Sequence, residues 1–275
     1  MDKTHRESLK WLLTSKESAV YDFAKTILHA VYGEVIESPA GLIAIGDIPV
    51  ALVAHIDTIY DTPPSVVYYD NQEKVMWSPS GLGADDRAGV FAIIQILEYG
   101  YKPSIILTRG EEQGAIGARV FGKKACPIPN LKYLIELDRA GEKDCVFYQC
   151  NNRDFVQYIE SFGFVEAPGS YTDITFLMPK WEICGVNLSI GYEDEHSCSE
   201  TLHIEQLENT IVKVINLLTS ASAAPDFVYT EAKPTVGINY CGNCYNVMII
   251  PEEAIEVKKD NGVIKYVCKK CVELK

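Results

Sequence analysis

Seven histidine and acidic residues between positions 55 and 196 have the types and spacing of a site that could do chemistry. Each lies just past a short apolar run of strand character, or opens the helix that follows one. They are His55, Asp57, Asp85, Glu111, Glu112, Asp138 and His196. Asp85 to Glu111 and Glu112 to Asp138 are both 26 residues, about one β–α unit each. Because functional groups collect at the carboxyl ends of strands in open α/β sheets, we expect these side chains to meet in one cleft.

Two imidazoles and several carboxylates in one cleft would repel one another unless a cation lay among them. A mixed nitrogen and oxygen donor set without a thiolate suits zinc, with manganese or cobalt as alternatives. Two adjacent ions would need one shared ligand, and only a carboxylate can bridge them in that way. The remaining histidines, His5, His29 and His203, lie in the N-terminal segment, on a helix and just before one, and carry no such signal.

The elements that must position these residues alternate along the chain. Short, nearly continuous apolar runs predict strands buried on both faces at 49–55, 103–108, 131–137 and 183–190. Helices are predicted at 85–100, 113–124 and 152–163, and strongly amphipathic ones at 14–33 and 204–220. Thr14 and Glu17 have the spacing of a capping box at the start of the first strong helix. The alternation predicts an α/β domain with a mostly parallel central sheet.

The composition is that of an ordinary globular protein, with 47% hydrophobic and 23% charged residues in a chain of 275. A formal net charge of −13 argues against a nucleic-acid binder. The first residues lack the apolar core of a signal peptide, and no run approaches the roughly 18 apolar residues of a membrane span. Five of the nine cysteines follow no pattern, which is typical of free thiols in a reducing compartment, so we expect a cytoplasmic protein.

Residues 219–235 contain small residues, two prolines and no periodicity, and predict a linker at 222–233 between a domain at 1–221 and a smaller one at 234–275. The smaller domain has two Cys-x-x-Cys pairs, Cys241 with Cys244 and Cys268 with Cys271. Four thiolates in this pattern predict one closed structural zinc in a β-type zinc ribbon, with two redox dithiols as the alternative. A closed four-cysteine site is not catalytic. Because the domain is also nearly neutral, a role in protein docking or oligomerisation fits it at least as well as nucleic-acid binding.

Five motifs in order resemble the signatures of the dinuclear zinc exopeptidase clan. They are His-x-Asp-Thr at 55–58, GADDRAG at 83–89, EEQGAIGA at 111–118, Asp138, and DEHS at 194–197. The resemblance implies a three-layer sandwich and two catalytic metal ions. It also implies that His55, Asp85 and Asp138 hold one ion while Asp85, Glu112 and His196 hold the other, with Asp85 as the bridge.

The same resemblance implies that Glu111 is the general base and later the general acid, and that Asp57 accepts the ring N–H of His55. It further implies a cis peptide between Asp85 and Asp86, which leaves Asp86 to cap the following helix. Larger members of the clan have a domain inserted either between the fourth and fifth motifs or between the first and second. Here only 57 residues separate Asp138 from His196 and only 27 separate Asp57 from Asp85, too few for either insertion. The layout resembles the compact single-domain aminopeptidases.

These observations favour a hydrolase of small peptides or amides, and an aminopeptidase is the preferred interpretation. A deacylase or other amidohydrolase acting on N-acyl substrates has the same metal chemistry and stays open. If the protein were a non-catalytic adaptor that acts through the ribbon, its metal-binding motifs would have lost residues. Here every ligand position of the five motifs keeps the residue type that the resemblance requires. Arg139, and Asp173 in the segment GSYTDITF, are the candidate substrate-binding residues, although an ordinary salt bridge explains Arg139 equally well. Arg87 could pair with Asp86 or simply extend the helix start.

Overall fold

The computed structural model describes residues 1–231, 238–240, 247–249, 254–258 and 264–268. The chain divides into two compact units, Met1–Glu231 and Ala232–Lys275. None of the helices in the described ranges combines the length and apolar character that a membrane span requires.

The first unit is built on an eight-stranded sheet in the order β1-β2-β6-β3-β7-β10-β8-β9. Its four central strands, β6, β3, β7 and β10, are parallel, and antiparallel pairs extend it on both sides. The strands are β1 Ile36–Ser38, β2 Gly41–Ala44, β3 Ile48–His55, β6 Pro103–Thr108, β7 Tyr133–Arg139, β8 Asp144–Val146, β9 Val165–Glu166 and β10 Cys184–Ser189. The predicted α/β class and the four predicted strands are therefore confirmed.

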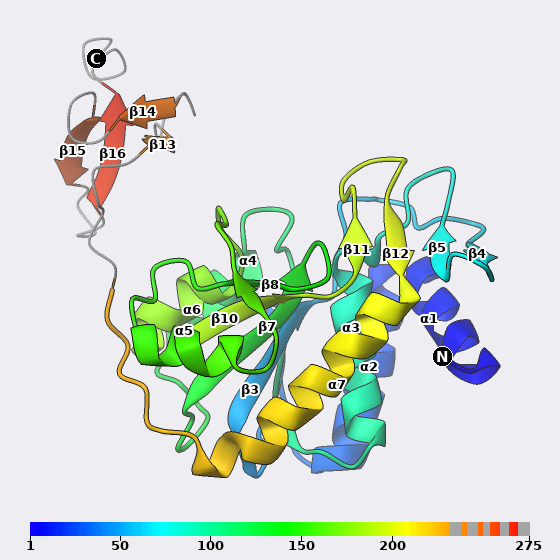
Figure 1. The fold of residues 1–275 in the computed structure, drawn as a ribbon, viewed down its shortest axis with the longest axis horizontal. Helices are drawn as coiled ribbons and strands as arrows, with labels where there is room; N and C mark the ends of the chain where they lie inside the picture. Colours follow the sequence, from blue (N-terminus) through cyan, green and yellow to red (C-terminus); the bar gives the residue numbers. More distant parts are fainter. Residues whose placement is uncertain (232–237, 241–246, 250–253, 259–263, 269–275) are drawn as a thin grey trace. The chain divides into compact units, whose positions relative to one another are not determined.

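Helices cover both faces of this sheet (Figure 1). Helix α3 packs on β3 and β7 with α1 and α7 beside it, whereas α6 packs on β7 and β10 with α4 beside it. The helices are α1 Lys3–Thr14, α2 Glu17–Tyr32, α3 Ala84–Glu98, α4 Ile116–Phe121, α5 Arg153–Glu160, α6 Ile174–Trp181 and α7 Ile204–Ser220, followed by the 3₁₀ turn Ala221–Ala223. All five predicted helices are present, and α1 and α6 are additional.

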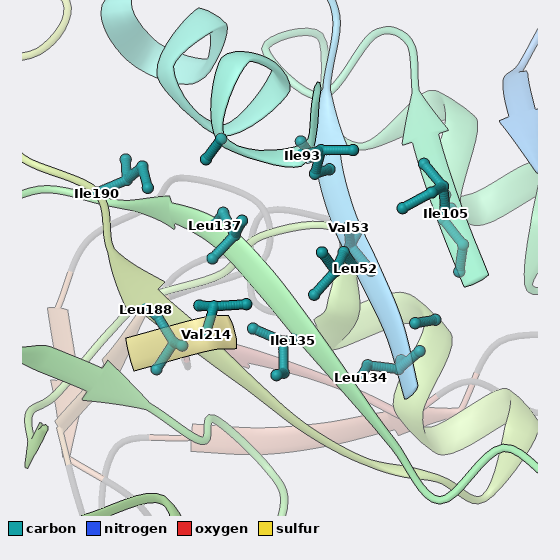
Figure 2. Close-up of a cluster of buried hydrophobic side chains, with 14 of the residues drawn as sticks. Leu52, Val53, Ile93, Ile105, Leu134, Ile135, Leu137, Leu188, Ile190 and Val214 are labelled. Atoms are coloured by element: carbon teal, nitrogen blue, oxygen red, sulfur yellow. The ribbon is translucent and has the colours of Figure 1, made fainter. Parts of the chain in front are cut away.

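The core explains why the strands read as continuous apolar runs. In Figure 2, Ile135 and Leu137 of β7 lie on the side of Ile93 and Val214, which belong to α3 and α7. Leu134, on the opposite face, contacts the α6 side of the sheet, where it approaches Gly185 beside Met178. Because β7 is buried on both faces, its residues before Asp138 are apolar or aromatic except for Glu136, and burial raises the pKa of that carboxyl group.

Two local predictions differ from the structure. Helix α2 begins at Glu17 with Lys16 as its cap residue and no side-chain cap, because the Thr14 hydroxyl instead donates to the carbonyl of Lys10 and completes α1. The linker predicted at 222–233 overlaps the first unit. Phe227 is buried against the rings of Tyr133, Phe155 and Tyr158, and this apolar contact keeps the segment on the domain.

A second, antiparallel sheet was not predicted. Its order is β11-β12-β5-β4, from β11 Tyr192–Glu193, β12 Thr201–His203, β5 Val75–Trp77 and β4 Tyr68–Asp70. Strands of two or three residues carry too little periodicity to be recognised in a sequence. This sheet matters because the β11–β12 connection carries His196.

The second unit contains two antiparallel pairs, β13 Ile238–Tyr240 with β14 Val247–Ile249 and β15 Ala254–Lys258 with β16 Ile264–Cys268. Cys268 is the last residue of β16, while Cys241, Cys244 and Cys271 lie outside the described residues. The structural zinc site therefore stays a prediction.

Candidate metal centre

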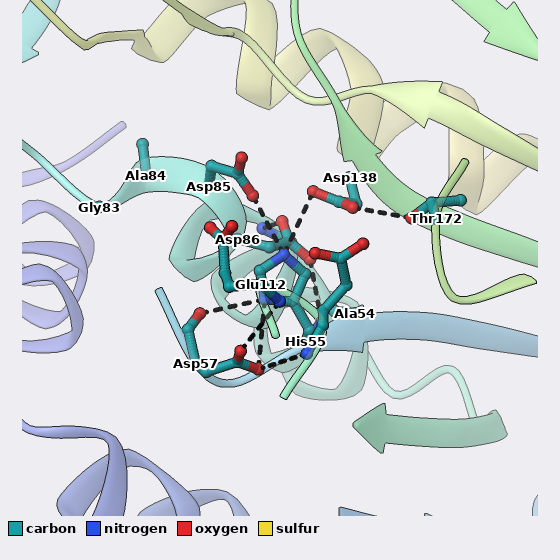
Figure 3. A network of polar contacts seen from close by, with 12 residues as sticks. Ala54, His55, Asp57, Gly83, Ala84, Asp85, Asp86, Glu112, Asp138 and Thr172 are labelled. Atoms are coloured by element: carbon teal, nitrogen blue, oxygen red, sulfur yellow. Dashed lines mark hydrogen bonds and ion pairs between the residues drawn. The ribbon is translucent and has the colours of Figure 1, made fainter. Parts of the chain in front are cut away.

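The predicted site residues meet at one edge of the large sheet. Strand β3 is central and has β6 on one side and β7 on the other, so the strand order reverses there. The parallel strands β3, β6 and β7 all end at this edge. Strand β3 ends in His55, β6 ends in Thr108 shortly before Glu111, and β7 ends in Arg139 directly after Asp138. Figure 3 shows His55 surrounded by the carboxylates that the sequence places far from it. Such a switch point is the usual ligand site of an open α/β sheet.

Asp85 lies between the two histidines. Its Oδ1 is 3.0 Å from Nε2 of His55, and its Oδ2 is 3.1 Å from Nε2 of His196. Each imidazole has a further carboxylate partner, since His55 Nε2 is 3.6 Å from Asp138 Oδ1 and His196 Nε2 is 3.1 Å from Glu112 Oε1. The two oxygens of one carboxylate thus face two separate donor groups.

Neighbouring side chains hold Asp138 in this position. Its Oδ1 accepts a hydrogen bond from the Tyr192 hydroxyl and its Oδ2 accepts one from Thr172, each at 3.0 Å. The Asn187 side chain bonds both the N–H and the carbonyl of Asp138. These contacts leave the carboxylate little rotational freedom, as expected for a metal ligand oriented by an outer shell.

Asp86 has a different task from its neighbour. Its Oδ1 accepts from the N–H of Gly89, and its Oδ2 accepts from the N–H of His55. The first bond is the helix cap that the sequence predicts, and the peptide between Asp85 and Asp86 is cis. By distance alone, His55, Asp86 and Asp138 form one potential metal group and His55, Asp85 and Glu112 another. Asp85 is the better candidate for both groups, because its two oxygens face the Nε2 atoms of His55 and His196, whereas those of Asp86 accept from the backbone.

Asp57 organises the loop after β6. Its Oδ1 accepts from the N–H groups of Gly110 and Glu111, and its Oδ2 accepts from that of Glu112. The ring nitrogen Nδ1 of His55 is 3.0 Å from the main-chain carbonyl of Asp57 and 3.6 Å from its carboxylate. The predicted contact of His55 with Asp57 is thus present, with the shorter distance to the carbonyl, and the carboxylate mainly fixes the backbone that carries the two glutamates.

The two glutamates point to different partners. Glu112 contacts His196, whereas the Glu111 carboxylate lines a cavity of about 340 Å³ together with Asp85, Asp138, Arg139 and Tyr171. Burial raises the pKa of Glu111 to about 9, and the nearby carboxylates add to this effect against the opposing charge of His55. This carboxyl group is not engaged by His196, and divalent ions bound nearby would favour its ionised form, which can accept a proton.

A buried carboxylate that the sequence analysis overlooked holds the glycine-rich loop. Glu200 Oε2 accepts from the N–H groups of Leu82 and Gly83, and its Oε1 accepts from those of Ala84 and Asp85, at 2.7–3.1 Å. The sequence indicates only that some acceptor is needed, because a loop that precedes a buried helix has several backbone N–H groups that must be hydrogen-bonded. No local pattern in the sequence assigns that acceptor to Glu200.

Of the two predicted substrate-binding residues, Arg139 lies in the cavity wall and Asp173 does not. Arg139 lines the cavity, and its Nη2 is 3.4 Å from Asp144 while its Nε is buried without a partner among the described residues. Asp173 does not line the cavity, which corrects its assignment as a substrate-binding residue. It is fully buried at the start of α6, where it accepts from the Thr108 hydroxyl. Tyr171, two residues earlier, forms part of the wall instead.

The electrostatics favour bound cations. Burial opposes the ionisation of Asp85, but His196 and His55 outweigh it and lower the Asp85 pKa. Asp85 and Glu112 raise the pKa of His196 to about 10, and burial together with the Asp85 charge raises that of Asp138 to about 7. The raised pKa values of His196 and Asp138 reflect protons retained among clustered negative charges, and divalent ions would offset that charge better.

The geometry fits such ions. Four ligands at zinc distances of about 2.0–2.1 Å in a tetrahedron lie about 3.3 Å from one another. The donor pairs here are 3.0–3.6 Å apart, and the donors are imidazole nitrogens and carboxylate oxygens. His55, Asp85 and Asp138 could hold one ion, and Asp85, Glu112 and His196 a second.

No protein-family model and no curated protein matches the sequence. Solved structures do match its fold. A TET aminopeptidase from a marine-sediment Thaumarchaeota archaeon has a TM-score of 0.63 at 14% identity, over 79% of this chain and 97% of that one. A tripeptidase from Staphylococcus aureus has a TM-score of 0.62 at 13% identity, over 80% and 98%. Aminopeptidase PepT from Bacillus cereus has a TM-score of 0.60 at 13% identity, over 79% and 98%. The first unit therefore has the fold that these peptidase structures share.

Proposed function

We propose that this protein is a dinuclear metal-dependent hydrolase of peptide or amide bonds, and specifically an aminopeptidase. The observation that carries the proposal is the position of Asp85, whose two oxygens face His55 and His196 at 3.0 and 3.1 Å. An arrangement in which one carboxylate is shared by two mixed nitrogen and oxygen donor sets suits a pair of zinc ions, with manganese or cobalt as alternatives.

Two divalent ions held there would supply an activated water and polarise the scissile carbonyl. Glu111 would take the proton from that water and pass it to the leaving nitrogen, because its carboxyl group lines the same cavity without pairing with His196. Asp57 would keep Glu111 in place through the backbone bonds to residues 110–112. Glu200 would do the same for Asp85 through residues 82–85.

The acidic cavity favours substrates with a protonated α-amine. Glu195 lines the cavity beside His196 and adds a further negative charge near the ligands. The likeness in fold to structures described as aminopeptidases supports the same choice. We expect small peptides as substrates, no membrane partner, and a cytoplasmic location. The C-terminal ribbon, with one structural zinc on Cys241, Cys244, Cys268 and Cys271, would serve docking or oligomerisation.

One observation favours a second candidate, a deacylase of N-acyl amino acids. Arg139 lines the cavity with its Nε buried and unpartnered among the described residues, so it could pair with a substrate carboxylate. The two functions separate by substrate: the zinc-loaded protein should release amino acids from aminoacyl amides and leave N-acyl amino acids intact. Faster turnover of the N-acyl compounds would favour the deacylase. Absence of metal-dependent turnover on both would contradict the hydrolase.

A further inference from the structure

A second cavity lies against the loop that carries Asp57. It has a volume of about 350 Å³, and in the described part of the chain it shares no lining residue with the metal-centre cavity. Its wall contains Lys16, Ser18, Thr58, Tyr60, Arg87 and Arg109. Asp57 also lines it, but none of the six residues named is assigned to the reaction above, so the cavity needs an explanation of its own.

The unusual feature of this cavity is the guanidinium group of Arg87. The residue is only 3% exposed, and its Nε and Nη1 have no hydrogen-bond partner within the described ranges. Neighbouring Asp86 does not supply one, because its oxygens accept from the backbone of Gly89 and His55. Burial lowers the Arg87 pKa only to about 10, so the group is charged at neutral pH. A buried cation without a partner is costly unless a ligand satisfies it.

The first turn of α2 lies in the same wall. This 16-residue helix has Lys16 as its cap residue and no side-chain cap, so its first N–H groups have no side-chain acceptor. Residues 15–18 all line the cavity. Uncapped N–H groups and the helix dipole together favour an anion at such a position.

The acidic groups in the wall are largely engaged elsewhere. Glu17 accepts from Arg109 Nε at 2.5 Å, and the Asp57 carboxylate accepts from three backbone N–H groups. Asp61 is the remaining carboxylate of this wall and is exposed to solvent. Glu17 and Asp57 lie near enough to stabilise the Arg87 charge, but no carboxylate in the described part of the wall forms an ion pair with Arg87 or Lys16.

We propose that this cavity is a binding site for a small tetrahedral oxyanion of the sulfate or phosphate type, held by Arg87, Lys16 and the first N–H groups of α2. The planar guanidinium matches two oxygens of such an anion, and the helix N–H groups match the others. The site does not depend on the metal centre, and it would bind its anion even if the hydrolase assignment were wrong.

The test is isothermal titration of the full-length, zinc-loaded protein with sodium sulfate, with ionic strength held constant by sodium chloride. Sulfate is the probe because phosphate groups are also good ligands for divalent ions. We expect one saturable site per chain. Arg87→Lys should weaken binding about tenfold or more, because the bidentate fork is lost, and Lys16→Ala should weaken it several-fold.

Arg139→Met is the matched control, since it removes a guanidinium from the metal-centre cavity instead and should leave sulfate affinity unchanged. Lys16 is exposed, so Lys16→Ala decides the question if Arg87→Lys does not fold. The proposal is overturned if no saturable binding occurs, if both Arg87→Lys and Lys16→Ala bind sulfate like the wild type, or if affinity falls in Arg139→Met alone.

Discussion

The Glu200 carboxylate offers the sharpest test of how the centre is assembled. It accepts four backbone N–H bonds from residues 82–85, the last of them from Asp85 itself. Glu200→Gln keeps the size of the side chain but replaces one acceptor oxygen with an NH₂ group, so two of the four N–H groups face a donor. At about 1–3 kcal/mol for each buried donor left unpaired, the free energy of unfolding should fall by about 2–6 kcal/mol.

For a domain of this size, that loss corresponds to a decrease in Tm of roughly 5–20 °C. Displacement of the Asp85 backbone should also weaken metal binding by about 10–100-fold, as other outer-shell substitutions do. Competition with a chelator at 20 °C, well below the unfolding transition, measures this second effect separately. Glu193→Gln is the control, because Glu193 lies in β11, at the start of the connection that ends at Glu200, but is half exposed and has only a 3.6 Å contact with His203. A Glu200→Gln protein with wild-type Tm and wild-type metal affinity would refute the reasoning.

Three further predictions follow from the site. Glu111→Gln should lower kcat by about 10²–10⁴ while keeping the metal content, and a near wild-type rate would contradict its assignment as the base. Metal analysis should give close to three ions per chain, two removable by mild chelation with loss of activity; a single ion that resists chelation would contradict the dinuclear centre. Asp173→Asn should have a higher Tm than the wild type. This difference should grow from pH 4 to pH 6 and stay constant at higher pH. Burial raises the Asp173 pKa from 3.8 to about 6, so ionisation above pH 6 costs about 3 kcal/mol that Asn avoids, whereas below pH 4 both forms are neutral.

The parts of the fold that the sequence predicts well are those whose signal is local. Strands β3, β6, β7 and β10 are buried on both faces, so their apolar runs are long and their boundaries agree with the prediction within about two residues. Helix α7 shows the same clarity because its apolar stripe extends over 17 residues. Since polar residues begin where these strands end, the meeting of His55, Glu111 and Asp138 at one edge follows from the strand pattern.

The remaining features depend on contacts that the sequence does not display. The small sheet consists of two short hairpins, β4–β5 and β11–β12, joined by a pairing of β12 with β5 that brings together residues over a hundred positions apart, such as Leu202 and Met76. Thr14 could cap α2 or complete α1, and both uses fit the same spacing. Asp173 follows a polar segment like a surface residue, yet the approach of Thr108 from β6 makes its position fully buried.

The acidic residues of the centre divide into two classes that the sequence cannot distinguish. Asp57, Asp86 and Glu200 are buried carboxylates whose oxygens accept backbone N–H groups, at residues 110–112, at 55 and 89, and at 82–85. Asp85, Glu112 and Asp138 approach imidazole nitrogens instead. The first class therefore holds the backbone of the loops, whereas the second class faces the imidazoles and is available to ligands. The adjacent pair Asp85 and Asp86 contains one member of each class, since Asp85 faces the two imidazoles and Asp86 accepts from the backbone of His55 and Gly89.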